Sequence, residues 1–242
     1  MNTNKPLVAI TGASSGIGAA IAQHFSQAGH PVLLMGRRKD RLEALNLENA
    51  IVAVVNVNDR AQTEAAFRAA EARHGPTDCL VNNAGMMLLG EIDTQDPSEW
   101  QKMLDVNVTA LLNTTQVVLG DMKARKGGTI INISSTAGRK SYPLHTAYCG
   151  TKFAVHAISE TLRAEVAKDD VRVITVGPGA TETELLGHTT SDEIKTGYEN
   201  WKTEMGGILA PDDVARSVLF AYQQPQNVCI RELLITATRQ DA

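Results

Sequence analysis

The chain has 242 residues, enough for one α/β domain with a complete hydrophobic core. Hydrophobic residues make up 43% and charged residues 21%, which is ordinary for a soluble globular protein. The 23 Lys and Arg against 27 Asp and Glu give a net charge of −4 with no basic block, which excludes nucleic acid as the main partner.

The sequence shows no sign of a membrane or metal protein. No apolar stretch approaches the roughly 18 residues that a membrane span needs. The run Leu7–Ile10 is too short for a signal-peptide core, so a cytoplasmic location is expected. The cysteines Cys79, Cys149 and Cys229 lie far apart without a C-x-x-C pair, which predicts reduced thiols and no metal site.

Short apolar runs of β type alternate with longer helical stretches along the whole chain. The predicted strands are Leu7–Thr11, Pro31–Gly36, Ile51–Asn56, Asp78–Asn82, Thr129–Ser134, Arg172–Val176 and Glu232–Ile235. The predicted helices are Gly16–Ala28, Lys39–Asn46, Arg60–His74, Ser98–Arg125, Thr146–Lys168 and Pro211–Gln223. This alternation predicts an α/β fold of the Rossmann type: a doubly wound, seven-stranded parallel sheet with helices on both faces. Without a repeat or linker, residues 1–242 are expected to form a single domain.

The stretch Thr181–Ile208 does not follow the regular pattern. It is polar, contains four glycines and Trp201, and follows the end of a predicted strand. Ligands of open α/β sheets bind at such strand ends, and long insertions in compact domains are usually functional. We therefore expect a mobile substrate lid around residues 181–208; an ordinary surface helical excursion is the alternative.

A glycine-rich turn joins the first strand to the first helix. Gly12, Gly16 and Gly18 permit a tight turn, and the helix N-terminus after it supplies N–H donors for a pyrophosphate. The spacing is G-x-x-x-G-x-G, not the commoner G-x-G-x-x-G. A plain turn is the alternative, but its place between strand and helix favours dinucleotide binding.

The residues after the second strand predict which dinucleotide is bound. Arg37 and Arg38 stand where an acidic residue would bind the ribose of NAD, and the first carboxylate is Asp40. An arginine contact to a 2′-phosphate, worth about 1.5–3 kcal/mol, favours NADP(H) by about 10- to 150-fold. We expect Arg37 to be the stronger contributor; a solvated basic start to a helix is the alternative. Asn56 and Val57, after the third strand, are expected to border the adenine.

Four polar residues in the middle of the chain could move a proton. Tyr148 and Lys152 lie on one face of a predicted helix, and Ser135 follows the fifth strand. A nearby ammonium should lower the tyrosine pKa from ~10. Asn107 could hold a water that links Lys152 to solvent. Taken by themselves, a Tyr and a Lys four residues apart are more often a surface pair, and an Asn in an apolar helix is more often a hydrogen-bonded core residue. Together with the glycine turn, the four residues indicate hydride transfer.

The combination resembles the short-chain dehydrogenase/reductase family, in its compact branch, from Leu7 to about Ile235. The motifs that carry the resemblance are T-G-A-S-S-G-I-G at Thr11–Gly18 (with Ser14, Ser15 and Ile17), N-N-A-G at Asn82–Gly85 (with Asn83 and Ala84), Asn107, Ser135, Y-x-x-x-K at Tyr148–Lys152, and P-G-A-T-E-T at Pro178–Thr183 (with Gly179 and Thr181).

The resemblance implies a role for each matching residue. Tyr148 would be the general acid in reduction and the general base in oxidation, with Lys152 holding the nicotinamide ribose. Ser135 would orient the carbonyl, and Asn107 would anchor a proton-relay water. The Pro178–Thr183 segment would bind the nicotinamide amide. The resemblance further implies NADP(H) as cofactor, a small carbonyl or alcohol substrate, and a homotetramer or homodimer.

One residue departs from the family, and the substrate is open. Relatives commonly carry aspartate where this chain has Asn56, which is expected to weaken adenine binding at most. Met86–Leu89 could line an apolar pocket. Arg139, Lys140 and His145 could contact substrate, although surface charge on a loop is the simpler interpretation. A catalytically silent NADP(H)-binding regulator and a lyase or isomerase are the alternative functions.

Overall fold

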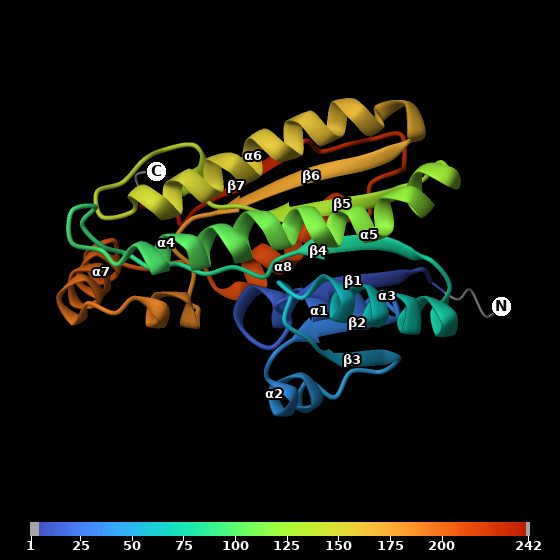
Figure 1. Ribbon diagram of the computed structural model, residues 1–242, viewed down its shortest axis with the longest axis horizontal. Helices are drawn as coiled ribbons and strands as arrows, with labels where there is room; N and C mark the ends of the chain where they lie inside the picture. Colours follow the sequence, from blue (N-terminus) through green and yellow to red (C-terminus); the bar gives the residue numbers. More distant parts are fainter. Residues whose placement is uncertain (1–4, 241–242) are drawn as a thin grey trace.

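The computed structural model describes residues 5–240 and shows one seven-stranded parallel sheet (Figure 1). The strand order is β3-β2-β1-β4-β5-β6-β7. This confirms the predicted Rossmann-type α/β fold. The strands are β1 (Leu7–Thr11), β2 (Val32–Gly36), β3 (Ala50–Val54), β4 (Thr77–Asn82), β5 (Gly128–Ile133), β6 (Val171–Pro178) and β7 (Glu232–Ile235).

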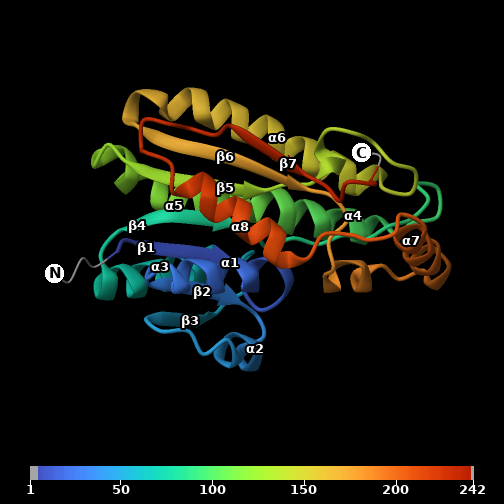
Figure 2. The same ribbon diagram turned by 180° about the vertical axis from the view of Figure 1, so that it is seen from behind.

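Helices cover both faces of the sheet (Figures 1 and 2). Helices α1 and α8 pack on one face, and α3, α5 and α6 on the other, each group closing a hydrophobic cluster against the strands. The helices are α1 (Gly16–Gln27), α2 (Lys39–Ala44), α3 (Arg60–His74), α4 (Pro97–Leu104), α5 (Ala110–Ala124), α6 (Thr146–Val166), α7 (Asp192–Glu204) and α8 (Pro211–Tyr222).

The central strands are buried on both faces. Every residue of β1, β2, β5 and β6 is buried, which explains why these runs are almost continuously apolar. The chain winds outward in opposite directions from β1 and β4, which are neighbours in the sheet. Such a reversal leaves a crevice at the carboxyl ends of the strands, where ligands of this architecture bind.

The predicted helix Ser98–Arg125 is wrong in one respect, because it is not continuous. A π-helical turn, Asp105–Thr109, separates α4 from α5. Each π turn adds a residue to the helical repeat and shifts the side chains that follow, and such turns are frequent at functional sites. Here the turn contains Asn107.

The 181–208 segment forms an excursion beyond the carboxyl ends of the strands (Figure 1). It contains a short 3₁₀ turn, Glu184–His188, and the amphipathic helix α7. A bridge between Thr181 and Leu209 brings the two ends of the segment together. Within residues 5–240, no helix has both the length and the apolar character needed to cross a bilayer.

Candidate active site

A cavity of about 1410 Å³ opens at the carboxyl ends of the strands and reaches under the 181–208 segment. Almost every predicted site residue lines it, whereas Gly18 and Asn107 lie behind its wall. The predicted residues that line it are Gly12, Ser14, Ser15, Gly16, Ile17, Arg37, Arg38, Asn56, Val57, Asn83, Ala84, Gly85, Ser135, Tyr148, Lys152, Pro178, Gly179, Thr181 and Thr183.

The glycine turn is held against the N-N-A-G motif. The Asn83 side-chain amide donates hydrogen bonds to the carbonyls of Thr11 and Gly12, at 2.9 and 3.2 Å. In return, the Thr11 hydroxyl accepts from the backbone N–H groups of Asn83 and Ala84. A Cβ on Gly18 would lie 2.4 Å from both the Gly12 carbonyl and the Asn83 amide. Gly18 therefore permits close packing, and Asn83 shapes the turn.

Arg38 lies directly over this turn. Its guanidinium donates to the hydroxyls of Ser14 and Ser15, and to a Glu184 carboxylate oxygen at 2.6 Å. Arg41 also contacts Glu184. The hydrogen bonds from Arg41 and Arg38 lower the pKa of Glu184 to about 2. Arg37 is exposed and lines the cavity. Both predicted arginines thus line the cavity beside the glycine turn, and Arg38 is the one anchored to the turn.

Gln240 is a cavity residue that the sequence gave no reason to expect. Its side-chain oxygen accepts a hydrogen bond from the Ala180 N–H at 3.0 Å, and a Cβ on Gly179 would overlap its amide. Gln240 therefore sets the course of the Pro178–Thr183 segment. It lies after the last strand, outside any motif, so only the folded chain reveals it.

Tyr148 and Ser135 meet at the middle of the cavity. Tyr148 lies in the first turns of α6 and is 5% exposed, and its phenol lies near the Ser135 hydroxyl. Burial raises the pKa of Tyr148 above its ordinary value, and the nearby Ser135 hydroxyl offsets this only in part. The expected lowering of the tyrosine pKa by a nearby ammonium is therefore wrong, because desolvation dominates.

Lys152 lies one helical turn after Tyr148. Its ammonium donates to the Ile133 carbonyl at 3.0 Å and lies 5.8 Å from the centre of the Tyr148 ring. Burial lowers the pKa of Lys152 to about 8, because desolvation disfavours the charged form. Since Ile133 ends β5 and Ser135 follows two residues later, the end of β5 positions the side chains of both Lys152 and Ser135.

Asn107 is buried and its amide is fully engaged. The side-chain oxygen accepts from the Met86 N–H at 2.8 Å. The side-chain nitrogen donates to the Met86 carbonyl at 2.9 Å and the Thr151 hydroxyl at 3.0 Å. Asn107 therefore joins the π-helical turn to α6 and to the chain after N-N-A-G. Its side chain holds the frame behind Tyr148 and Lys152.

The remaining predicted substrate residues divide into two groups. Met86, Met87, Leu89 and His145 line the cavity, whereas Leu88 does not. Arg139 instead forms a two-point ion pair with Glu232, at 2.8 and 2.6 Å. The Lys140 ammonium lies 5.8 Å from the centre of the Tyr142 ring. Neither basic residue lines the cavity, whose wall also includes residues not predicted individually: Gln95, Glu99, Tyr142, Tyr198 and Trp201.

Comparison with known proteins identifies the family. The family model for short chain dehydrogenases matches residues 6–194. A glycine betaine reductase of Emericella nidulans is 40% identical over 93% of this chain, which spans only 18% of that longer protein. An uncharacterized oxidoreductase of Listeria monocytogenes is 35% identical over 99% of both chains.

Solved structures give the same result. The closed form of a serine dehydrogenase complexed with NADP⁺ matches with a TM-score of 0.91 at 33% identity, covering 98% of this chain and 96% of the other. A serine dehydrogenase from Escherichia coli matches with a TM-score of 0.84 at 32% identity, covering 98% of this chain and 100% of the other. With its motifs gathered around one cavity, this chain belongs to the short-chain dehydrogenase family.

Proposed function

We propose that the protein is an NADP(H)-dependent oxidoreductase that interconverts an aldehyde, ketone or oxo acid with the corresponding alcohol. One observation carries the proposal: Tyr148, Ser135 and Lys152 adjoin one another in the same cavity that the glycine turn and two arginines line. The cavity thus combines a proton donor with a dinucleotide cradle. When bound, the reduced nicotinamide supplies the hydride that reaches the carbonyl carbon.

The protein's own residues supply the proton and the orientation. Burial keeps the Tyr148 phenol protonated, which suits a general acid that delivers a proton to the carbonyl oxygen during reduction. Ser135, close to that phenol, orients the carbonyl beside it. The Lys152 ammonium, held by the Ile133 carbonyl, favours the phenolate that forms. Asn107 is a positioning residue, because its side-chain amide is bonded to Met86 and Thr151, and a water beside Lys152 would relay the proton to solvent.

The cofactor end supports NADP(H) over NAD(H). Arg38 is held over the glycine turn by Ser14 and Ser15, and Arg37 stands beside it in the cavity wall. No carboxylate precedes Asp40 on this loop. A guanidinium binds a 2′-phosphate with two parallel hydrogen bonds. Relatives that are complexed with NADP⁺ lend further support.

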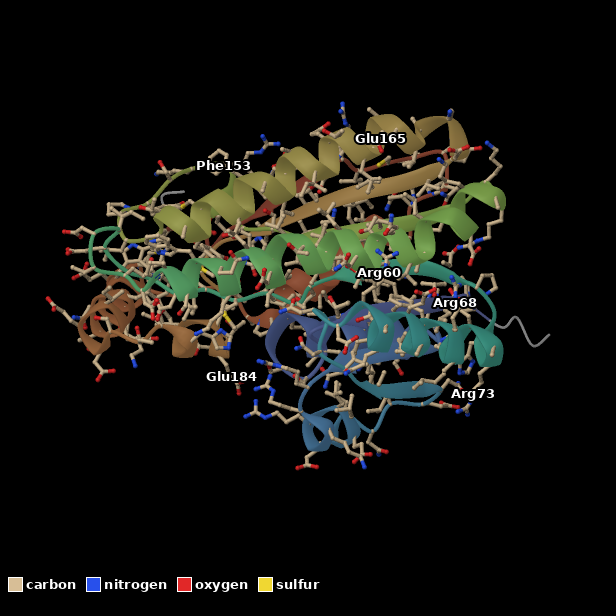
Figure 3. All side chains as sticks on the ribbon, viewed as in Figure 1. Arg60, Arg68, Arg73, Phe153, Glu165 and Glu184 are labelled. Atoms are coloured by element: carbon tan, nitrogen blue, oxygen red, sulfur yellow. The ribbon has the colours of Figure 1, made fainter. Side chains whose placement is uncertain are left out.

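The proposal includes a lid and self-association. The 181–208 segment lines the cavity, and its two ends are joined where Thr181 pairs with Leu209, so we assign it as the substrate lid. Exposed Leu104, Leu112 and Phe153 lie on α4, α5 and α6 (Phe153 in Figure 3), which fits a homodimer or homotetramer packed through these helices. We also propose a cytoplasmic location.

The test is NADPH oxidation with a panel of aldehydes, ketones and oxo acids, with NADH in parallel. Tyr148→Phe should abolish reduction, because it removes only the acidic hydroxyl, while NADPH binding stays within about threefold of the parent. Equal activity in that variant would refute the role of Tyr148. Tight NADPH binding without turnover of any carbonyl would instead favour the silent regulator, and turnover without net NADPH consumption would favour a lyase or isomerase.

A further inference from the structure

Five aromatic rings converge on the substrate end of the cavity. The centre of the His145 ring lies 5.7 Å from that of Tyr142, 6.3 Å from Tyr148 and 6.4 Å from Tyr198. Trp201 lies 5.2 Å from Tyr198. All five line the cavity, and the paired planes are inclined by 37° to 63°. We call these five rings the aromatic box; Tyr148 lies at one side of it, in contact with His145.

This concentration of rings is selective. Phe, Trp and Tyr make up only 4% of the chain, yet three of its four tyrosines line this cavity. The phenylalanines lie elsewhere: Phe25 and Phe67 are fully buried in the core, and Phe153 and Phe220 are exposed on helices. The rings in the box are therefore mostly phenol and indole, whose faces attract cations more strongly than an aliphatic wall would.

The charges on the same wall have the matching sign. Glu99 is only 8% exposed, and its carboxylate accepts hydrogen bonds from the neutral Gln95 amide and Thr190 hydroxyl. A buried carboxylate held by neutral donors favours a nearby cation. Lys202 is ion-paired with Glu182 and Glu199. On the cavity wall formed by residues 90–106 and α7, Lys102 is the one other lysine among the lining residues. The carboxylates on that wall are Glu91, Asp96, Glu99, Asp105 and Glu193.

We propose that the substrate is a small aldehyde, or its alcohol, that carries a methylated ammonium group. Tyr142, Tyr198 and Trp201 would surround the cation, and Glu99 would supply the counter-charge. A methylated ammonium has few or no N–H donors, so ring faces replace the hydrogen bonds that a primary amine would need. His145 contacts both Tyr148 and Tyr198, so a cation held at Tyr198 would lie on the same side of the cavity as the acid. The inference rests on the proposed reduction at Tyr148.

Two aldehydes of the same shape test the charge alone. Trimethylammonioacetaldehyde and 3,3-dimethylbutanal differ only by nitrogen for carbon at the branch point. In each reaction the aldehyde takes a hydride from NADPH and a proton, and leaves as the primary alcohol with NADP⁺. We expect kcat/KM to be about 30-fold higher for the cation, the factor that a desolvated cation–π contact supplies. Equal or reversed values would overturn the inference.

Variants locate the effect in the rings and the carboxylate. Tyr198→Leu should lower the ratio of kcat/KM for the two aldehydes about tenfold, and Tyr198→Phe should restore most of it, because the ring face returns. Glu99→Gln should lower the ratio through KM. Phe220→Leu removes an aromatic ring outside the cavity and should leave the ratio unchanged. If neither Tyr198→Leu nor Glu99→Gln changes the ratio, the selectivity arises elsewhere and the proposed cation site is contradicted.

The two proposals fail separately. If Tyr148-dependent reduction of 3,3-dimethylbutanal is as efficient as that of the cation, the proposed cation site is refuted and the proposed reductase activity is supported. If neither aldehyde oxidises NADPH, calorimetry on the NADPH-bound protein compares 2-(trimethylammonio)ethanol with 3,3-dimethylbutan-1-ol. Tighter binding of the cation by about tenfold would support the cation site and refute the reductase activity on these aldehydes. Equal binding, or none, would refute the cation site.

Discussion

The carboxylate of Glu184 lies 2.6 Å from the guanidinium of Arg38, and this ion pair connects the 181–208 segment to the glycine turn (Glu184 in Figure 3). Arg38 also donates hydrogen bonds to Ser14 and Ser15, so its side chain contacts both the glycine turn and the 181–208 segment. The pKa of Glu184 is lowered from 4.5 to about 2, so the pair stays formed at neutral pH. A 2′-phosphate would compete with Glu184 for this guanidinium.

Glu184→Gln should therefore strengthen NADPH binding. The substitution removes the competing negative charge and leaves Arg38 in place, so Kd for NADPH should fall about 3- to 5-fold, as expected for an exposed ion pair. Kd for NADH should change less, since NADH has no 2′-phosphate. Fluorescence titration of both cofactors checks this.

Glu204→Gln is the matched control for that substitution. Glu204 is exposed at the end of α7, and its substitution by glutamine also removes one negative charge from the same segment. Both Kd values should stay at the parental level. Weaker NADPH binding in Glu184→Gln would show that the ion pair orders the site more than it competes for Arg38.

Reduction should lose activity above pH 8. The pKa of Lys152 is lowered to about 8, so its ammonium is present at pH 7 and lost as pH rises through this value. Without that charge, the phenolate left by proton transfer is less stabilised. The pH profile of kcat/KM for reduction should be level from pH 6 to 7.5 and fall with an apparent pKa near 8. In Lys152→Arg, which stays charged throughout, the fall should vanish. A profile level to pH 9.5 in the parent would contradict the assignment.

Gly18→Ala should disable cofactor binding. The added methyl would lie 2.4 Å from the Gly12 carbonyl and the Asn83 amide, so the turn must shift. We expect NADPH affinity to fall by at least about 100-fold, because the turn's N–H groups lose their alignment. Gly120→Ala on α5 meets nothing within 4 Å and should stabilise the protein by about 0.5–1 kcal/mol. Titration and thermal unfolding compare the two, and parental affinity in Gly18→Ala would refute the close packing.

Asn107→Ala should destabilise the protein by about 2–3 kcal/mol. The change leaves the Met86 N–H and carbonyl and the Thr151 hydroxyl without their partner behind the cavity wall. Urea unfolding measures the loss. Asn113→Ala, in the partly exposed part of α5, should cost less than about 0.5 kcal/mol. A similar small cost at Asn107 would show that its hydrogen bonds are replaced by water.

The sheet was predictable because parallel strands buried on both faces are written as short apolar runs. All seven predicted strands exist, with ends displaced by no more than two residues at any boundary. Helix α7 was foreseen only as an alternative, a surface helical excursion without bounds, because its polar composition and Gly197 mask the amphipathic pattern. The π-helical turn at Asn107 was also missed, since a single extra residue leaves no periodic signal in sequence.

The candidate site was predictable where motifs carry it and not where distant residues meet. Gly12, Tyr148 and Lys152 stand in local patterns with a direct chemical meaning. Tyr142 and Tyr198 lie far apart in the chain, and both pack against His145 only in the folded protein. The pKa of Tyr148 depends on burial, which spacing alone does not report. Gln240 reaches the Ala180 N–H only through the completed sheet.

The pairing of Thr181 with Leu209 has a consequence for how this fold changes its chemistry. Tyr148 and Lys152 stand on α6, and Ser135 follows β5, whereas Tyr198 and Trp201 stand on α7 in a segment whose two ends meet at one point. Such a loop can be exchanged for another length or composition at little entropic cost, because its anchor points stay adjacent. Residues 182–208 could thus be replaced as a unit, which would change one wall of the cavity and leave Ser135, Tyr148 and Lys152 in place.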